Sequence, residues 1–218
     1  MRKIILLSFV CLSAQVFAQK SFFGSDAGVD VANQRVHVEI YNQNSSPNPY
    51  GLQPFVSNSF FQNIVRPAAG IFYHLGINEK MGVRFKAQYL CLGYKNKWAN
   101  PDRVEINYLY LPVTFHYSIL PKFSLSAGPY LCFTLGGTRI YQQDITGVYH
   151  KNDNGLEFGV EYDVFKNVAI GTRYILGLKN IWLNDNIGQP YAGGSVGRTE
   201  YTNRALQLTL IYKFKKPS

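Results

Sequence analysis

The sequence predicts an all-β protein, an eight-stranded antiparallel up-and-down transmembrane β-barrel with short periplasmic turns and long extracellular loops. Three observations predict this fold class. Apolar and polar residues alternate with a period of two, the connections are short and long in turn, and the composition is rich in aromatic residues. Aromatic residues make up 15% of the 218 residues and charged residues only 16%, whereas soluble domains average about 25% charged.

Residues 1–18 are expected to be a cleavable signal peptide. Arg2 and Lys3 form a basic n-region, an apolar stretch follows, and residues 16–18 give a small-residue cleavage site. The apolar stretch is too short for a membrane anchor. Phe9 and Val10 precede Cys11 where a lipoprotein would have small residues. No later apolar run is long enough for a membrane helix, so strands would have to cross the membrane.

The strand pattern places the barrel at residues 35–214. Residues 19–34 are left as an N-terminal segment of undefined structure, and residues 215–218 as a basic tail. In the segment at 155–164, Phe158 and Tyr162 lie on one face, opposite Glu157 and Glu161 on the other. The same alternation marks seven further segments, at residues 35–41, 69–77, 81–89, 108–118, 123–135, 168–178 and 205–214.

The connections between these segments fix the arrangement of the strands. Short turns, each with one lysine, are predicted at residues 78–80, 120–122 and 165–167. They alternate with long links rich in Gly, Pro, Asn, Asp and Ser, at residues 42–62, 95–105, 136–154 and 179–203. Eight antiparallel strands with both termini at one end would produce this alternation.

Alternation alone does not tell which face points outward. A soluble calyx of the lipocalin type would hold the apolar face inside, and a membrane barrel would turn it toward lipid. Charged residues on the non-apolar face favour the membrane barrel, because an eight-stranded lumen is narrow enough for side chains to fill it. We expect an ionic network there, formed by Arg84, Lys86, Glu157, Glu161, Asp163 and Arg173.

The export signal and the positions of the cysteines argue against a nucleic-acid partner and against a disulfide bond. Loss of Arg2 and Lys3 with the leader lowers the formal charge from +9 to +7. Export argues against nucleic acid as the partner of this basic chain. Cys91 and Cys132 fall on opposite faces of non-adjacent strands, so no disulfide is expected between them.

Four segments carry a family resemblance: "YLYLPVTFHYS" and "LSAGPYLCFTLGG" in the middle of the chain, then "RYILGLKNI" and the closing "NRALQLTLIYKF". They resemble the PorT-like, or "porin family", small outer-membrane β-barrel proteins of Bacteroidetes-type bacteria, with OmpX/OmpA-like architecture. The resemblance covers residues 65–214, whereas the family's N-terminal G-x-x-x-G-L-N pattern is missing. It implies an outer-membrane location, an eight-stranded barrel and no enzyme activity.

The resemblance also implies a role for the closing strand. In such barrels the assembly machinery recognises an amphipathic last strand that ends in an aromatic residue, here Leu210, Tyr212 and Phe214. Aromatic residues in the long links are candidate contacts for a protein or other surface ligand, although they could equally belong to a membrane girdle or to loop packing. These candidates are Trp98, Tyr141, Trp182 and Tyr191.

The sequence gives only weak indications of a catalytic or ligand-binding site. His116 and Ser118 have the H-x-S spacing of lipid A deacylases, but the next strand offers Gly128 and Tyr130 in place of a carboxylate. The glycine-rich residues 192–199 lack a following helix for phosphate binding. The histidines show no metal-like spacing, and His37, His74 and His116 are expected in the lumen. No catalytic residue, metal or cofactor is predicted.

The predicted function is therefore a non-enzymatic outer-membrane barrel with an envelope-structural or surface-loop binding role. The alternatives are an accessory component of a protein secretion system, a narrow channel and a lipid-modifying enzyme. The expected partners are outer-membrane lipid, the barrel-assembly machinery and a protein or surface ligand at the loops. A monomer is expected, with no nucleic acid bound.

Overall fold

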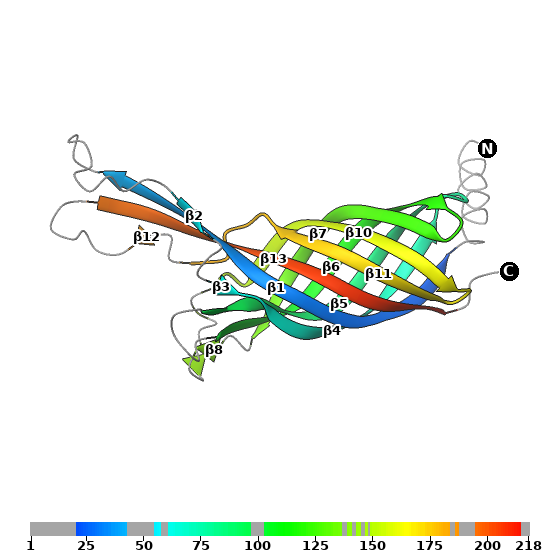
Figure 1. Ribbon diagram of the computed structural model, residues 1–218, viewed down its shortest axis with the longest axis horizontal. Helices are drawn as coiled ribbons and strands as arrows, with labels where there is room; N and C mark the ends of the chain where they lie inside the picture. The colour runs from blue at the N-terminus through cyan, green and yellow to red at the C-terminus, as the bar shows by residue number, and fades with distance from the viewer. Residues whose placement is uncertain are drawn as a thin grey trace, which may run out of the picture.

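Eight long strands form a closed antiparallel barrel (Figure 1). The computed structural model describes residues 21–42, 55–57, 61–96, 103–136, 139–140, 143–144, 147, 149–183, 186–187 and 195–214. The barrel strands are β1 (Phe22–Asn42), β4 (Ile64–Gly76), β5 (Met81–Asn96), β6 (Arg103–Leu120), β7 (Phe123–Gly136), β10 (Asn152–Phe165), β11 (Val168–Gly177) and β13 (Ser195–Phe214). The predicted fold class is confirmed.

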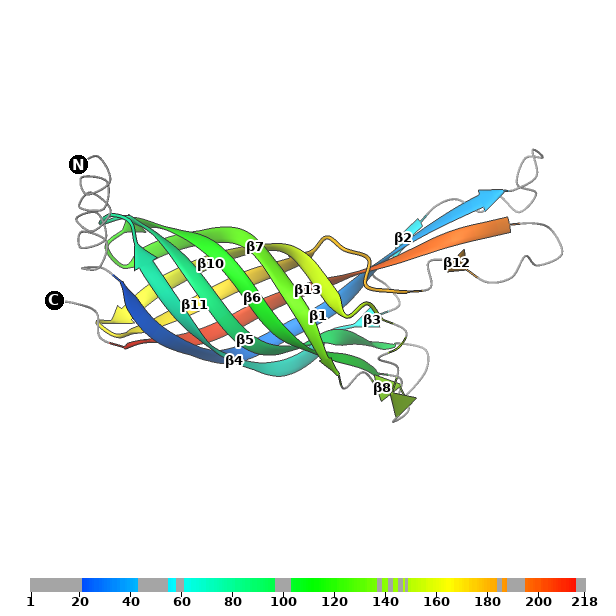
Figure 2. The same ribbon diagram turned by 180° about the vertical axis from the view of Figure 1, so that it is seen from behind.

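Each barrel strand pairs with its neighbour along the chain, and β13 pairs with β1 to close the sheet. The short turns, at residues 77–80, 121–122 and 166–167, lie at the same end as the start of β1 and the end of β13. We call this the turn end, and the opposite end the loop end. Figure 2 shows β4, β5, β6 and β7 crossing the wall at a tilt to the barrel axis. None of the described residues forms a helix long and apolar enough to span a membrane.

The first strand differs from the expectation. It begins at Phe22 rather than at Arg35. The part of β1 that pairs with β4 lies within residues 19–34, to which the sequence analysis assigned no structure. Glycine, alanine and aspartate in this segment are poor strand formers, and they hid the alternation. The face assignment also changes, because Val36 is buried and faces inward while His37 faces outward. The prediction of His37 in the lumen was therefore wrong.

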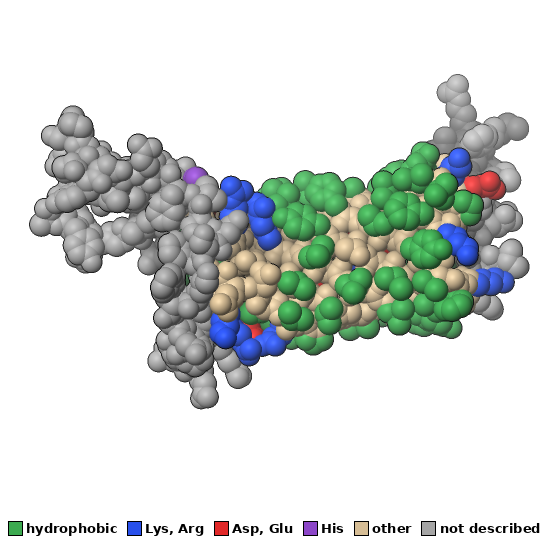
Figure 3. Space-filling view, in the orientation of Figure 1, with side chains coloured by type: hydrophobic (Ala, Val, Ile, Leu, Met, Phe, Trp, Pro, Cys, Tyr) green, Lys and Arg blue, Asp and Glu red, His purple; other side chains and the backbone are tan. Residues whose placement is uncertain are grey.

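The face of the outer wall seen in Figure 3 carries apolar and aromatic side chains along most of its length, and we call this zone the apolar belt. The predicted outward faces of β10, β11 and β13 are exposed on it, for example Phe158, Tyr174 and Leu210. Aromatic residues gather toward the turn end, where Phe165 and Phe23 are among the most exposed side chains. In water such a surface would be unfavourable, whereas in a bilayer it faces lipid.

Strands β1 and β13 continue together beyond the rest of the barrel. Pairing of β1 with β4 ends at Ala32, and pairing of β11 with β13 ends at Arg204. The β1–β13 ladder nevertheless runs on to Asn42 and Ser195. This two-stranded extension is flanked by β2 (Phe55–Ser57) and β12 (Asn186–Ile187) (Figure 1). We call it the ribbon. The remaining short strands are β3 (Phe61–Gln62), β8 (Arg139–Ile140) and β9 (Gln143–Asp144).

Candidate functional site in the barrel interior

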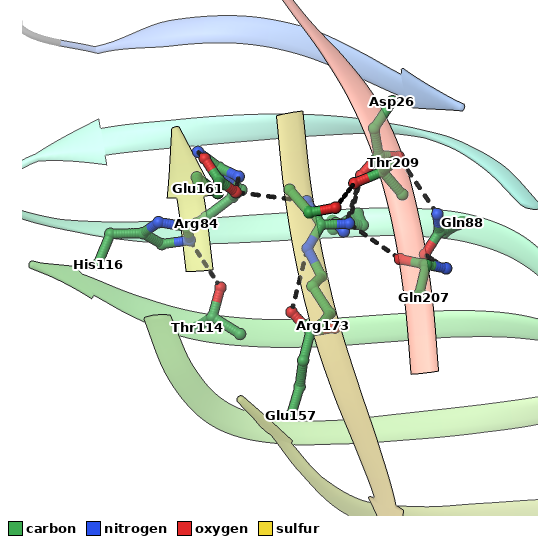
Figure 4. A network of polar contacts seen from close by, with 12 residues as sticks. Asp26, Arg84, Gln88, Thr114, His116, Glu157, Glu161, Arg173, Gln207 and Thr209 are labelled. Atoms are coloured by element: carbon green, nitrogen blue, oxygen red, sulfur yellow. Dashed lines mark hydrogen bonds and ion pairs between the residues drawn. The ribbon is translucent and has the colours of Figure 1, made fainter. Parts of the chain in front are cut away.

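The polar centre of the lumen is Arg173 on β11, which is 1% exposed. Its Nη1 donates to Asp26 Oδ2 at 2.7 Å and to Gln207 Oε1 at 3.0 Å. Its Nη2 donates to Glu161 Oε1 at 3.4 Å, and its Nε lies 3.7 Å from Glu157 Oε1 (Figure 4). One guanidinium therefore ties together four strands, β1, β10, β11 and β13.

Two further cations complete the charge balance. Arg84 on β5 donates through both terminal nitrogens to the two oxygens of Glu161, with Nη2 and Oε2 3.0 Å apart. Lys86 Nζ, also on β5, lies 2.8 Å from Asp26 Oδ2. We call the six buried residues Asp26, Arg84, Lys86, Glu157, Glu161 and Arg173 the ionic layer. It contains three cations and three carboxylates, so its formal charges cancel.

Small residues make room for these long side chains. A Cβ atom at Gly159 would lie 2.5 Å from Ser126 Oγ and 3.2 Å from Arg173 Cγ. Arg84 also stacks on an aromatic ring, with its Cζ 4.3 Å from the centroid of Phe72. The arginines thus lie among close-packed neighbours inside the barrel wall.

The structure brings together five of the six residues proposed from the sequence for the lumen network. The sixth, Asp163, lies apart near the turn end, where it pairs with Lys213 of β13. The sequence analysis missed Asp26, because residues 19–34 were not assigned to a strand. It also missed Asp30, which accepts a hydrogen bond of 2.7 Å from Gln207 Nε2. The spacing of Asp26, Asp30 and Gln34 by four residues, all on one strand face, could have indicated them.

The loop half of the lumen is filled by a different kind of side chain. We call the following buried cluster the apolar layer: Ala32, Ile64, Ala68, Leu90, Leu92, Tyr94, Val104, Ile106, Tyr108, Tyr110, Tyr130, Cys132, Tyr149, Ile175, Ile181 and Ala205. Tyr110 joins the two layers, since its hydroxyl donates to Glu157 Oε2 at 2.7 Å. Its ring packs against Tyr130, with centroids 4.9 Å apart.

Aromatic rings cover the loop side of the apolar layer. Trp182 packs against Tyr149 and Tyr201, with centroid distances of 5.1 Å to each ring. Phe61 contacts Tyr94 with centroids 3.9 Å apart. Burial raises the pKa of the Tyr149 phenol well above its usual range. Of the candidate loop contacts, Trp182 is partly buried and packs within this aromatic cluster. Trp98, Tyr141 and Tyr191 lie outside the described residues.

The histidines of the lumen do not assemble a reactive centre. His116 Nε2 lies 3.0 Å from Thr114 Oγ1, and its ring meets that of His74 edge-on at 5.5 Å. Ser118 is two residues along the strand, at the register position opposite Ser124. Within the part of the chain that the structure describes, no three His, Cys, Asp or Glu side chains form a group that could hold a metal. Cys91 and Cys132 are both buried as free thiols.

The arrangement of strands and wall corresponds to a known family. The family model described as "Outer membrane protein beta-barrel domain" matches residues 4–214. The chain belongs to this family. Membership supports an outer-membrane location for the barrel, in agreement with its apolar outer belt. No curated protein sequence matches the chain at a significant level.

Among solved structures that resemble the chain, one agrees with the family at the level of the fold. The outer membrane protein OprG from Pseudomonas aeruginosa gives a TM-score of 0.50 at 12% identity, covering 90% of this chain and 97% of its own. The Neisserial surface protein A, NspA, gives a TM-score of 0.45 at 14% identity, covering 88% and 97%. At 12% identity, the likeness to OprG concerns the barrel fold alone.

Proposed function

We propose that this protein is a non-enzymatic outer-membrane barrel that presents the ribbon and the long loops to a binding partner outside the cell. The observation that carries the proposal is the contrast between a filled lumen and an extended outer end. The ionic layer and the apolar layer occupy the interior. The β1–β13 ladder meanwhile continues past its barrel neighbours.

The ribbon has the geometry of a presented surface. From Asn33 to Asn42 it adds ten residues to β1 beyond the last pair with β4. At about 3.3 Å per residue this amounts to roughly 30 Å of ladder above the barrel. Its outer edges are β2 and β12, which are only three and two residues long. Sheet edges of this kind accept an extended segment of a partner through backbone hydrogen bonds.

Crosslinking in living cells tests the proposal. A photo-reactive amino acid is placed at Ile40 or at Gly197, which are register partners in the ribbon. The matched control position is Leu208, whose side chain is exposed on the outer wall of the same β13 strand. We expect a discrete protein adduct from the ribbon positions and none from Leu208. Identical adduct patterns from all three positions, or only lipid adducts, would refute a ribbon-presented partner.

A role as an accessory component of protein secretion is the second candidate. It is supported by the resemblance of the closing strands to PorT-like proteins of Bacteroidetes-type bacteria, carried by segments such as "NRALQLTLIYKF". Its test uses the same crosslinking adducts. Recovery of large secretion proteins from the ribbon positions would favour this candidate over a surface-ligand role.

A narrow channel would require an open path through both layers. We expect no conductance above background from the reconstituted barrel, because the side chains of the ionic layer are at most 6% exposed. Planar bilayer recording measures this directly. Stable single-channel steps from the unmodified protein would overturn the expectation.

The closing strand fits a role in assembly. Leu210, Tyr212 and Phe214 line the outer face of β13 at its C-terminal end, and the rings of Tyr212 and Phe214 pack 5.4 Å apart. We propose that these side chains are the surface that the assembly machinery recognises. Phe214→Ala should lower the amount of folded barrel in cells more than it lowers the stability of the refolded protein. Leu206→Ala, on the same face, is the matched control.

A further inference from the structure

Basic side chains gather on the outer wall where the apolar belt meets the loop end (Figure 3). We call this set the basic rim: Arg35, Arg66, Lys95, Arg103, Lys179 and Arg204. It draws on β1, β4, β5, β6 and β13 and on the residues after β11. Among the described side chains, the acids on the outer wall at this end are Glu105 and Glu200. The rim therefore has a clear excess of positive charge.

One half of the rim lies across β4, β5 and β6. Arg66 Nη2 and Arg103 Nε both form ion pairs with Glu105. Lys95 is the register partner of Arg103 on the neighbouring strand. Two arginines therefore share one carboxylate, and Lys95 adds a third cation at the neighbouring register position. The Arg103 side chain remains half exposed despite its ion pair, with a relative accessibility of 50%.

The other half lies across β13, β1 and the end of β11. Arg204 alternates with the buried residues Asn203 and Ala205, so its side chain points outward, and its Nη1 donates to Tyr174 Oη at 3.3 Å. Two residues further toward the turn end, Leu206 is 49% exposed in the apolar belt. Arg204 thus lies directly at the boundary between the belt and the loop end.

Arg35 and Lys179 extend this half of the rim. Arg35 lies between the buried residues Gln34 and Val36 on β1 and therefore also points outward. Lys179 donates to Asn152 at the start of β10. Positive side chains thus occur near the loop end on five barrel strands and on the residues after β11.

We propose that the basic rim binds the phosphate groups of lipid head groups in the outer leaflet, as carried by phosphorylated lipid A. Cations just above a lipid-facing belt lie at the depth of the head groups. Arginine presents its donors as a planar fork that matches phosphate oxygens, and the rim has four arginines. Charge complementarity therefore favours a phosphorylated lipid over a neutral one of the same chain length.

The turn end differs and supplies a control. Among the described residues, its exposed basic side chains are single lysines in the three short turns, Lys80, Lys122 and Lys166. Lysine is a strongly hydrated point charge and makes no planar fork. These lysines suit general anchoring at an interface, whereas the rim combines several cations, of which Arg66 and Arg103 meet at Glu105.

The test compares lipids that differ only in phosphate. The purified barrel in detergent micelles is titrated with lipid A that bears two phosphates, or with the same lipid A after enzymatic removal of both phosphates. Bound copies are counted by native mass spectrometry. The rim variant carries Arg66→Gln, Arg103→Gln and Arg204→Gln. The control variant carries Lys80→Gln, Lys122→Gln and Lys166→Gln and loses the same charge.

We expect the wild type and the control variant to bind phosphorylated lipid A, and the rim variant to bind it about tenfold more weakly or worse. The wild type should bind the dephosphorylated lipid as weakly as the rim variant binds the phosphorylated one. Equal binding of the two lipids by the wild type overturns the proposal even if the rim variant fails to fold. Equal weakening by the two variants overturns it too, as does displacement of the lipid by millimolar inorganic phosphate.

Discussion

The two halves of the lumen solve the problem of filling a narrow barrel in opposite ways. In the turn half, Arg173, Glu161 and their neighbours fill the space with paired charges. In the loop half, Leu90, Ile106 and Tyr108 fill it with apolar groups and aromatic rings. The outer wall is apolar at both heights. The loop half also buries polar side chains such as Asp153 and Asn203, but the paired charges of the interior are concentrated in the ionic layer.

This difference explains where sequence analysis succeeded. Along 155–164 the buried Glu157 and Glu161 alternate with exposed apolar residues, so the inward face could be identified. At residues 90–94 of β5 the side chains on both faces are buried, including Leu90 and the outward-directed Cys91. The two faces do not differ in polarity there, so the alternation of apolar and polar residues could not have predicted an apolar interior. The strand at residues 22–34 was missed for another reason, because small residues weakened the strand pattern.

The largest loss of stability is expected when the ionic layer is broken. Arg173→Ala leaves Asp26 and Glu157 without their nearest guanidinium inside the barrel, and it should destabilise the fold by about 3–5 kcal/mol. Urea unfolding in detergent, followed by the gel shift between folded and heated protein, measures this. Lys166→Ala in an exposed turn is the control, with an expected change near zero. An Arg173→Ala barrel that unfolds at the same urea concentration as the wild type would contradict the central role of this arginine.

The apolar layer should respond to a loss of volume rather than to a loss of charge. Leu90→Ala opens a cavity among buried neighbours and should cost about 2–4 kcal/mol. Leu208→Ala removes the same atoms from the outer wall, where lipid or detergent fills the space, and should cost much less. The same urea assay compares the two. Equal losses would mean that the interior at Leu90 is no better packed than the lipid face.

Loss of the Tyr110 hydroxyl, which joins the two layers, should destabilise the barrel more than loss of an ordinary hydroxyl group. Tyr110→Phe keeps the ring in the apolar layer but removes the donor to Glu157, and should cost about 1–3 kcal/mol. Combined with Glu157→Gln, the substitution tests coupling in a double-mutant cycle. Strictly additive effects would show that the two layers are energetically independent.

The smallest loss of stability is expected at an ion pair outside the ionic layer. Lys213 pairs with Asp163, whose side chain is 23% exposed near the turn end. Lys213 itself is buried, but water reaches Asp163 and screens the pair in part, so Lys213→Ala should cost about 1–2 kcal/mol, less than the loss of a fully buried pair. Raising the ionic strength should shrink the difference further. A loss as large as that of Arg173→Ala would place this pair in the same energetic class as the fully buried layer.

The register that joins Phe23 to Phe214 has a consequence for the order of folding. The other barrel pairings connect strands that follow one another along the chain, so they can form between neighbouring strands early in assembly. The first strand must wait for the last one. Asp26 travels with that first strand, and it is a counter-ion for Lys86 and Arg173. Closure of the cylinder and neutralisation of its interior therefore become one event, because a sheet without its first strand would hold three cations and only two carboxylates in the ionic layer.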